Sequence, residues 1–159
     1  MKRTVYIETT VPSFYYEVRT EPEMVARRDT TRRWWATERA HYDLYASVFT
    51  KGELERGDYP GKADALLLLE ELPILGVTPE IESIASVYVK RKLMPVEDAG
   101  DAYHLATASY YGVHFLLTWN CRHLANANKT HHVRTVNADL GLPVPIIVTP
   151  DMLFSEEAP

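Results

Sequence analysis

The chain has 159 residues, of which 46% are hydrophobic, and this length and composition suit one compact domain rather than two. The formal net charge of -5 and the pI near 5.7 exclude a protein that holds nucleic acid by bulk positive charge. No apolar run approaches the ~20 residues of a membrane span, and the single Cys121 excludes an internal disulfide framework. The N-terminus leads into a strand-like segment rather than a signal peptide, so we expect a cytoplasmic protein without membrane contact.

Apolar segments of strand length alternate with helical patterns, and this alternation predicts βαβ units around a parallel sheet. We expect strands at residues 4–7, 42–49, 74–77, 114–118 and 146–148. We expect helices at residues 21–40, around Glu53 as far as Gly57, and at residues 62–72, 79–91 and 96–111. The prediction is therefore a single domain over residues 1–154, followed by a short frayed tail at residues 155–159.

Residue type marks several of the helix boundaries. Thr20, with Glu23 three residues later, has the spacing of a capping box. Thr78 is a capping residue placed directly before a proline at the first helical position. Gly112 is suited to end the helix that precedes the fourth strand.

Polar residues occur at corresponding places in these units. Glu8 ends the apolar run of the first strand, Glu53 opens the short helix after the second, and Asn120 follows the fourth. Asp101 lies early in the helix before that fourth strand, with Asp98 three residues earlier. In open α/β sheets the ligand site lies beyond the carboxyl ends of the strands, so we expect these side chains to share one pocket.

Carboxylates at such a pocket favour a metal-dependent reaction. Carboxylate oxygens suit hard cations such as Mg²⁺ or Mn²⁺, and hydrolysis of a phosphodiester needs an ion of this kind. Taken singly, each acid is most simply a solvated surface group, since 22 of the 159 residues are Asp or Glu. Their joint placement at strand ends is what indicates a site.

Four segments together resemble a known family. They are residues 5–10 (VYIETT), 47–57 (SVFTKGELERG), 100–108 (GDAYHLATA) and 116–124 (LLTWNCRHL). In their order and context they resemble the PIN-domain family, particularly the VapC-like toxins of bacterial toxin-antitoxin pairs, over nearly the whole chain.

The resemblance implies a three-layer α/β/α sandwich with a central parallel sheet of four or five strands. It implies an endoribonuclease that hydrolyses single-stranded RNA with Mg²⁺ or Mn²⁺, a cognate antitoxin that occupies the active-site groove, and a homodimer. Matched to the motifs, the catalytic residues are Glu8, Glu53, Asp101 and Asn120. The metal ligands are Glu8, Glu53 and Asp101, with Asp98 as a fourth.

Two positions depart from the family pattern. The family's first acid is normally Asp, so Glu8 places its carboxylate about one bond length further out, which affects the geometry that Mg²⁺ requires. Asn120 stands where the family often has Asp, and it offers only a neutral oxygen. Asp98 either compensates for that lost charge or is a helix N-terminal acid that interacts with the macrodipole. These departures leave one rival function open, a non-catalytic PIN-like module that binds nucleic acid or a partner protein.

Hydroxyl and basic residues lie beside the acids. Thr9, Thr10 and Thr118 either orient a carboxylate or bind phosphate, and strand-end capping is an equally good account of them. Arg122 is placed to meet an RNA backbone, or else it solvates a loop. We therefore assign Thr9, Thr118 and Arg122 as candidate substrate-binding residues. Lys129 and Arg134 belong to the same polar region.

Other features have simpler explanations. His104 lies on the face of Asp101 but lacks the partners of a metal-binding histidine, so we expect a packed or supporting role. The stretch 27–35 (RRDTTRRWW) is suited to hold phosphates and stack bases, but helix packing by its Trp residues is the simpler interpretation. No phosphate-binding glycine loop, dinucleotide-binding turn or paired-cysteine metal site is present in the sequence.

Overall fold

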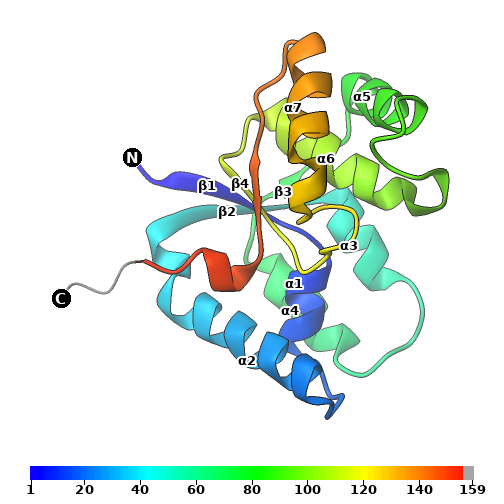
Figure 1. Cartoon of the computed structure of the whole chain (residues 1–159). Helices are drawn as coiled ribbons and strands as arrows, with labels where there is room; N and C mark the ends of the chain where they lie inside the picture. Colours follow the sequence, from blue (N-terminus) through cyan, green and yellow to red (C-terminus); the bar gives the residue numbers. More distant parts are fainter. Residues whose placement is uncertain (156–159) are drawn as a thin grey trace.

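The computed structural model describes residues 1–155, and its centre is a parallel sheet of five strands in the order β3-β2-β1-β4-β5 (Figure 1). In the central pairings, Val5 of β1 lies opposite Leu44 of β2 and Phe115 of β4. The strand bounds are β1 Arg3–Ile7, β2 Tyr42–Ser47, β3 Ile74–Leu75, β4 Phe115–Leu117 and β5 Ile146–Val148.

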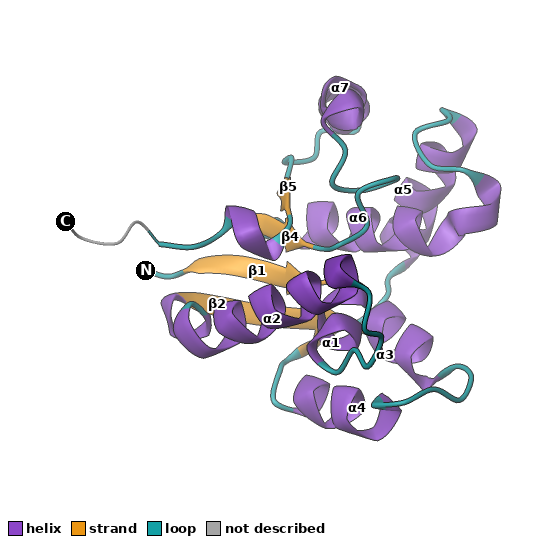
Figure 2. Ribbon diagram, turned by 60° about the horizontal axis from the view of Figure 1, so that its bottom comes forward, coloured by secondary structure: helices purple, strands orange, loops and turns teal. Residues whose placement is uncertain are grey.

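Helices cover both faces of this sheet, as Figure 2 shows. On one face lie α1 Thr10–Tyr15, α2 Pro22–Thr37 and α4 Lys62–Glu70, and on the other lie α5 Pro79–Lys90, α6 Ala99–Tyr111 and α7 Thr130–Asp139. The short helix α3 Val48–Glu55 follows β2. The predicted three-layer α/β/α architecture is confirmed.

The layers follow from the alternation of side chains along the strands. Val5 and Ile7 belong to the core under α1, α2 and α4, whereas Tyr6 belongs to the core under α5, α6 and α7. Both faces of a parallel sheet are buried in this way, so its strands are apolar throughout. The Trp residues of the 27–35 stretch pack in the first core, as expected, with Trp34 fully buried and Trp35 nearly so.

The second strand ends two residues earlier than predicted. Ser47 Oγ accepts hydrogen bonds from the backbone N–H groups of Phe49 and Thr50, so Ser47 is the N-cap of α3 and the helix begins at Val48. Glu53 consequently lies in the last turn of α3 and does not open the helix, which corrects the sequence-based placement. The third strand stops at Leu75, and the next carbonyl, that of Gly76, accepts the hydroxyl of Tyr111.

Two helix starts also differ from the prediction. The N-cap of α2 is Glu21 and makes no side-chain capping bond, so the capping box at Thr20 is wrong. The helix predicted from residue 96 begins at Ala99, because Val96–Asp98 forms a separate turn of 3₁₀-helix. Asp98 therefore occupies the N-cap position of α6, directly ahead of the helix that carries Asp101.

Two helices were not predicted at all, α1 and α7. Helix α1 has only 6 residues, too few to establish a helical period in the sequence. Helix α7 lies in the polar region after Asn120, where no element was predicted, and burial of Val133 and Val136 against the second core stabilises it. No helix within residues 1–155 is both long and apolar enough to cross a lipid bilayer. The predicted tail lies outside the described residues except for Ser155.

Candidate active site

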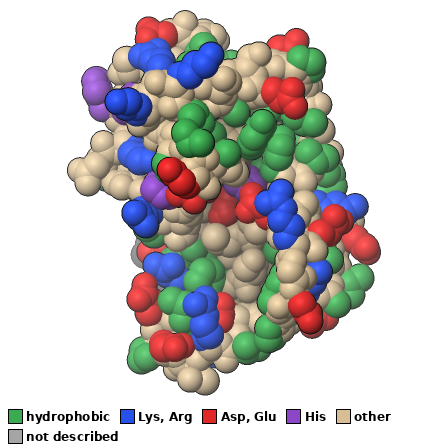
Figure 3. Space-filling view, turned by 90° about the vertical axis from the view of Figure 1, so that its right-hand side faces the viewer, with side chains coloured by type: hydrophobic (Ala, Val, Ile, Leu, Met, Phe, Trp, Pro, Cys, Tyr) green, Lys and Arg blue, Asp and Glu red, His purple; other side chains and the backbone are tan. Residues whose placement is uncertain are grey.

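The carboxyl ends of β1 and β4, the helix α3 and the N-terminus of α6 meet at one edge of the sheet (Figure 1). Figure 3 looks onto this side of the molecule and shows acidic and histidine side chains gathered near its middle, with lysine and arginine around them. Every polar position that the sequence indicated lies on these segments or on the loop after β4. Parallel pairing brings segments that are far apart in the sequence to this common edge.

Asp98, Asp101 and His123 form a compact group of metal-ligand type. One donor atom from each side chain lies within 4.8 Å of the other two. His123 Nε2 is 2.9 Å from Oδ2 of Asp98. Among residues 1–155 no other set of three or more His, Cys, Asp or Glu side chains meets this condition, so neither Glu8 nor Glu53 belongs to such a group.

Asn120 holds this group together. Its Nδ2 donates to Oδ1 of Asp101 at 3.0 Å, and its Oδ1 accepts the backbone N–H groups of Arg122 and His123 at 3.2 and 3.0 Å. The amide therefore fixes the loop that brings His123 to the acids. Burial raises the pKa of Asp101, although His104, Asn120 and His123 oppose the shift.

Glu8 points into the protein and is 3% exposed. Both of its carboxylate oxygens accept the backbone N–H of Thr10 at 3.0 Å, and Oε1 also accepts the hydroxyl of Thr118 at 2.9 Å. Burial raises the pKa of Glu8, against the opposing charge of His104 and these hydrogen bonds. Glu8 is thus buried and is held in one orientation by its neighbours.

Glu53 is paired with His104, a residue to which the sequence gave only a supporting role. His104 Nε2 lies 2.6 Å from Oε1 of Glu53, and its Nδ1 lies 2.6 Å from the hydroxyl of Tyr6. Burial alone would raise the pKa of Glu53, but the hydrogen bond and charge of His104 outweigh it and lower that pKa. Burial likewise disfavours the charged imidazole, yet Tyr6, Glu53 and Glu8 raise the pKa of His104 well above its ordinary value.

The backbone of α6 brings Glu53 close to Asp101. A Cβ atom placed on Gly100 would lie 3.0 Å from Oε1 of Glu53, so this carboxylate packs against the helix one residue before Asp101. The charge of His104 acts on Glu8, Glu53 and Asp101 together. The three acids that the sequence predicted are therefore brought around one buried histidine.

The threonines orient the acids and their loops. Thr118 is fully buried, donates to Glu8, and accepts the backbone N–H of Asn120 at 2.9 Å. Thr10 Oγ1 accepts the backbone N–H of Trp119 at 2.8 Å. Thr9 Oγ1 lies 3.4 Å from Nε2 of His104 and hydrogen bonds to Glu53. Thr9 and Thr118 thus orient carboxylates, and Thr10 and Thr118 also cap backbone N–H groups of the loop after β4.

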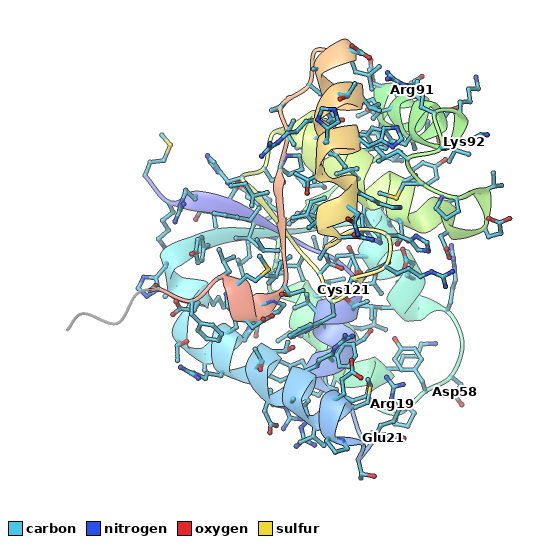
Figure 4. All side chains as sticks on the ribbon, viewed as in Figure 1. Arg19, Glu21, Asp58, Arg91, Lys92 and Cys121 are labelled. Atoms are coloured by element: carbon cyan, nitrogen blue, oxygen red, sulfur yellow. The ribbon has the colours of Figure 1, made fainter. Side chains whose placement is uncertain are left out.

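Basic side chains border the group on the side of α7. Arg122 is exposed, and Lys129 Nζ donates to the carbonyl of Leu93 at 2.9 Å. Burial lowers the pKa of Lys129, against the attraction of Asp101 and Asp98. Beyond these basic side chains, a cleft of about 460 Å³ lies between α7 and β5, and its lining includes Cys121, Arg134 and apolar side chains. Cys121 is labelled in Figure 4.

No family model matches the sequence, and no curated protein matches it. The fold is similar to that of a solved structure described as a toxin-antitoxin complex from Klebsiella pneumoniae, with a TM-score of 0.58. That similarity covers 92% of this chain and 97% of the other chain, and the two sequences are 16% identical. At this identity the likeness establishes the shared architecture of the two chains.

Proposed function

We propose that this chain is the toxin of a toxin-antitoxin pair and acts as a metal-dependent endoribonuclease on single-stranded RNA. The observation that carries the proposal is the convergence of Asp98, Asp101 and His123, with Glu53 and Glu8 alongside, at the carboxyl ends of the strands. The similarity of fold to a chain of a toxin-antitoxin complex supports the toxin part of the proposal. Four motif segments that resemble PIN-domain proteins support the nuclease part.

The donor set fits a divalent cation. Two carboxylates and one imidazole lie within 4.8 Å of one another, which is close enough to share one ion. Mg²⁺ prefers oxygen ligands alone, whereas the imidazole of His123 suits a transition metal, so this set favours Mn²⁺. When bound, the cation would stabilise charge on the scissile phosphate and lower the pKa of a water molecule.

The protein's own groups would complete the reaction site. Asp98, Asp101 and His123 would hold the ion. Asn120 fixes the position of Asp101 and of the loop that carries His123 through three hydrogen bonds. Glu53 places a third carboxylate beside them, where it is suited to orient an attacking water. The exposed Arg122 and the neighbouring Lys129 supply positive charge for the RNA backbone in a protein that is acidic overall.

The rival proposal is a PIN-like module that binds without cleaving. It is favoured by the buried position of Glu8, whose oxygens already accept hydrogen bonds from Thr10 and Thr118, and by the neutral Asn120. Such a module would bind RNA or an antitoxin equally well with or without a divalent ion. The two proposals differ in metal dependence and in turnover.

Cleavage of a panel of single-stranded RNAs by the purified protein, in EDTA and then in Mn²⁺ or Mg²⁺, tests the proposal. We expect cleavage only with a divalent ion, faster with Mn²⁺ than with Mg²⁺, and abolished by Asp101→Asn and by His123→Ala. The matched control is Asp139→Asn, which removes an exposed carboxylate paired with Arg91 on α5 and should leave cleavage intact. Tight RNA binding without cleavage under every condition would favour the rival module.

A further inference from the structure

A chain of hydrogen bonds runs beneath the acids and joins β1, the start of α3, and α6. Ser47 Oγ lies 2.6 Å from the hydroxyl of Tyr6, and that hydroxyl lies 2.6 Å from Nδ1 of His104. The opposite nitrogen of His104 is 2.6 Å from Oε1 of Glu53. Ser47, Tyr6 and His104 are at most 1% exposed, whereas the Glu53 side chain is 31% exposed. The chain therefore starts in the core and ends at the carboxylate that faces the site.

Each link restricts the next. A carboxylate can only accept, so Nε2 of His104 carries the hydrogen that it shares with Glu53. The imidazole has little freedom to rotate, because Tyr6 binds its other nitrogen and packs edge-on against it with ring centroids 5.7 Å apart. Tyr6 is held in turn by Ser47, and the same Ser47 oxygen caps α3 through Phe49 and Thr50.

Ser47 connects the start of α3 with the position of the Glu53 side chain, which lies in the last turn of the same helix. Within residues 1–155 the carboxylate of Glu53 makes no hydrogen bond to another side chain of that helix. His104 from α6 supplies the fixed donor, and the backbone at Gly100 closes the other side of Oε1. The carboxylate is thus ordered by a different helix from the one that carries it.

We propose that His104, braced by Tyr6 and Ser47, is the positioning residue of Glu53 and sets the direction in which this carboxylate faces a bound cation and RNA. The inference rests on the proposed function, since it names how one acid of that site is oriented. Tyr6 and Ser47 are fully buried, so Tyr6 acts on the site through His104, and Ser47 acts through Tyr6 and through the N-cap of α3. Loss of a group that orients a ligand typically costs about 10- to 100-fold in metal affinity or activity.

Three variants and one matched control test the role. Tyr6→Phe removes only the hydroxyl that braces His104, and His104→Gln keeps an N–H near the position of Nε2. Tyr88→Phe is the control, because its buried hydroxyl bonds to Asn137 and Ser109 in the core under α5, α6 and α7, away from the acids. We expect Tyr6→Phe to lower kcat for RNA cleavage about tenfold with KM unchanged, and Tyr88→Phe to keep the wild-type kcat. His104→Gln should recover activity that His104→Leu loses.

A second measurement does not depend on activity. The imidazole N–H that His104 shares with Glu53 is buried, so proton NMR of the wild-type protein should show it as a slowly exchanging downfield resonance. Glu53→Gln and Tyr6→Phe should each shift this resonance, and Tyr88→Phe should not.

The two measurements separate the two proposals. If Tyr6→Phe leaves the resonance or the cleavage rate of an active wild-type protein unchanged, the positioning role of His104 is wrong and the nuclease survives. If the resonance responds but the wild-type protein neither binds Mn²⁺ nor cleaves RNA, the nuclease is wrong, and the orientation of Glu53 by His104 is supported on its own.

Discussion

Burial governs the chemistry of Glu8. Desolvation raises the pKa of this carboxyl, so the folded protein holds the proton to a higher pH than the unfolded chain. The charged form therefore costs stability, and the cost appears as pH rises from the ordinary value of 4.5 through the raised pKa. We expect Glu8→Gln to increase the free energy of unfolding at pH 7 by an amount of the order of 1 kcal/mol.

Urea unfolding in EDTA at pH 7 and near pH 4.5 measures this effect. The gain from Glu8→Gln should shrink at the lower pH, because protonation of the wild-type carboxyl in the folded protein removes the cost of the buried charge. A variant that is less stable than the wild type at pH 7 would mean that the hydrogen bonds from Thr10 and Thr118 outweigh desolvation.

Asn120 places a neutral amide beside the carboxylate of Asp101. Its Nδ2 donates to Asp101, whereas an Asp at this position would place a like charge beside that carboxylate. We expect Asn120→Asp to lower the free energy of unfolding without metal by about 1 kcal/mol and to raise the affinity for Mn²⁺. Calorimetric titration with Mn²⁺ and unfolding in EDTA give the two quantities. An unchanged Mn²⁺ affinity would place the ion away from Asn120.

Gly100 gives a test that separates the site from stability. A Cβ here would lie 3.0 Å from Oε1 of Glu53, so Gly100→Ala should displace that carboxylate and weaken Mn²⁺ binding. Alanine is favoured over glycine inside a helix by up to about 1 kcal/mol, so thermal stability should hold or rise. Gly52→Ala in α3 is the control, because a Cβ there meets nothing within 4 Å. Equal Mn²⁺ affinity in both variants would show that Glu53 does not contribute to binding.

At the scale of elements, the N-cap of α3 links helix stability to the site. Ser47→Ala removes the acceptor of two backbone N–H groups and the partner of the Tyr6 hydroxyl. We expect a loss of about 1 kcal/mol in the free energy of unfolding, together with weaker Mn²⁺ binding. Thr78→Ala removes a cap of the same kind from α5, through the N–H of Ile81, and it should cost similar stability while leaving Mn²⁺ binding intact. Equal binding losses in both variants would indicate a general effect of instability.

The arginine-rich helix α2 contacts the loop that follows β4. Arg27 lies over the rings of Phe14 and Trp119, at 5.5 and 5.3 Å from their centroids. The indole N–H of Trp119 in turn donates to the hydroxyl of Thr31 on the same helix. These contacts join α2 to the loop that carries Asn120, so the helix helps to hold that loop in place.

At the scale of the whole molecule, the prediction concerns a partner. If the chain is a toxin, its expression alone should arrest growth of the host cell, and co-expression with a small protein encoded beside it should relieve the arrest and give a stable complex. Asp101→Asn should abolish the arrest while the complex still forms, because the variant changes one side chain of the site and leaves the fold intact. Harmless expression of the wild-type protein, with no neighbour that co-purifies, would contradict the toxin proposal and leave the nuclease proposal standing.

The sequence was sufficient for the architecture and for placing several polar residues at the carboxyl ends of the strands. Apolar strand segments that alternate with helical patterns give a parallel sheet whatever the details of packing, because both its faces must be covered. Glu8, Asp101 and Asn120 could be placed because they follow strands or open a helix, where hydropathy changes sharply. Boundaries set by single hydrogen bonds were not predictable in this way, as the cap at Ser47 and the separate turn at Val96–Asp98 show.

Only the tertiary structure decided which side chains meet. His123 joins Asp98 and Asp101 because the amide of Asn120 folds the following loop back towards α6, and no periodicity in the sequence carries that information. His104 reaches Glu53 from a different helix. It is itself held by a buried series of hydrogen bonds that starts at Ser47, 57 residues earlier in the sequence. Local sequence determines secondary structure through side-chain period and capping, whereas contacts between distant segments depend on how those elements pack. The sequence by itself therefore determined the fold and the edge of the sheet that carries the acids, and packing determined how those acids are oriented.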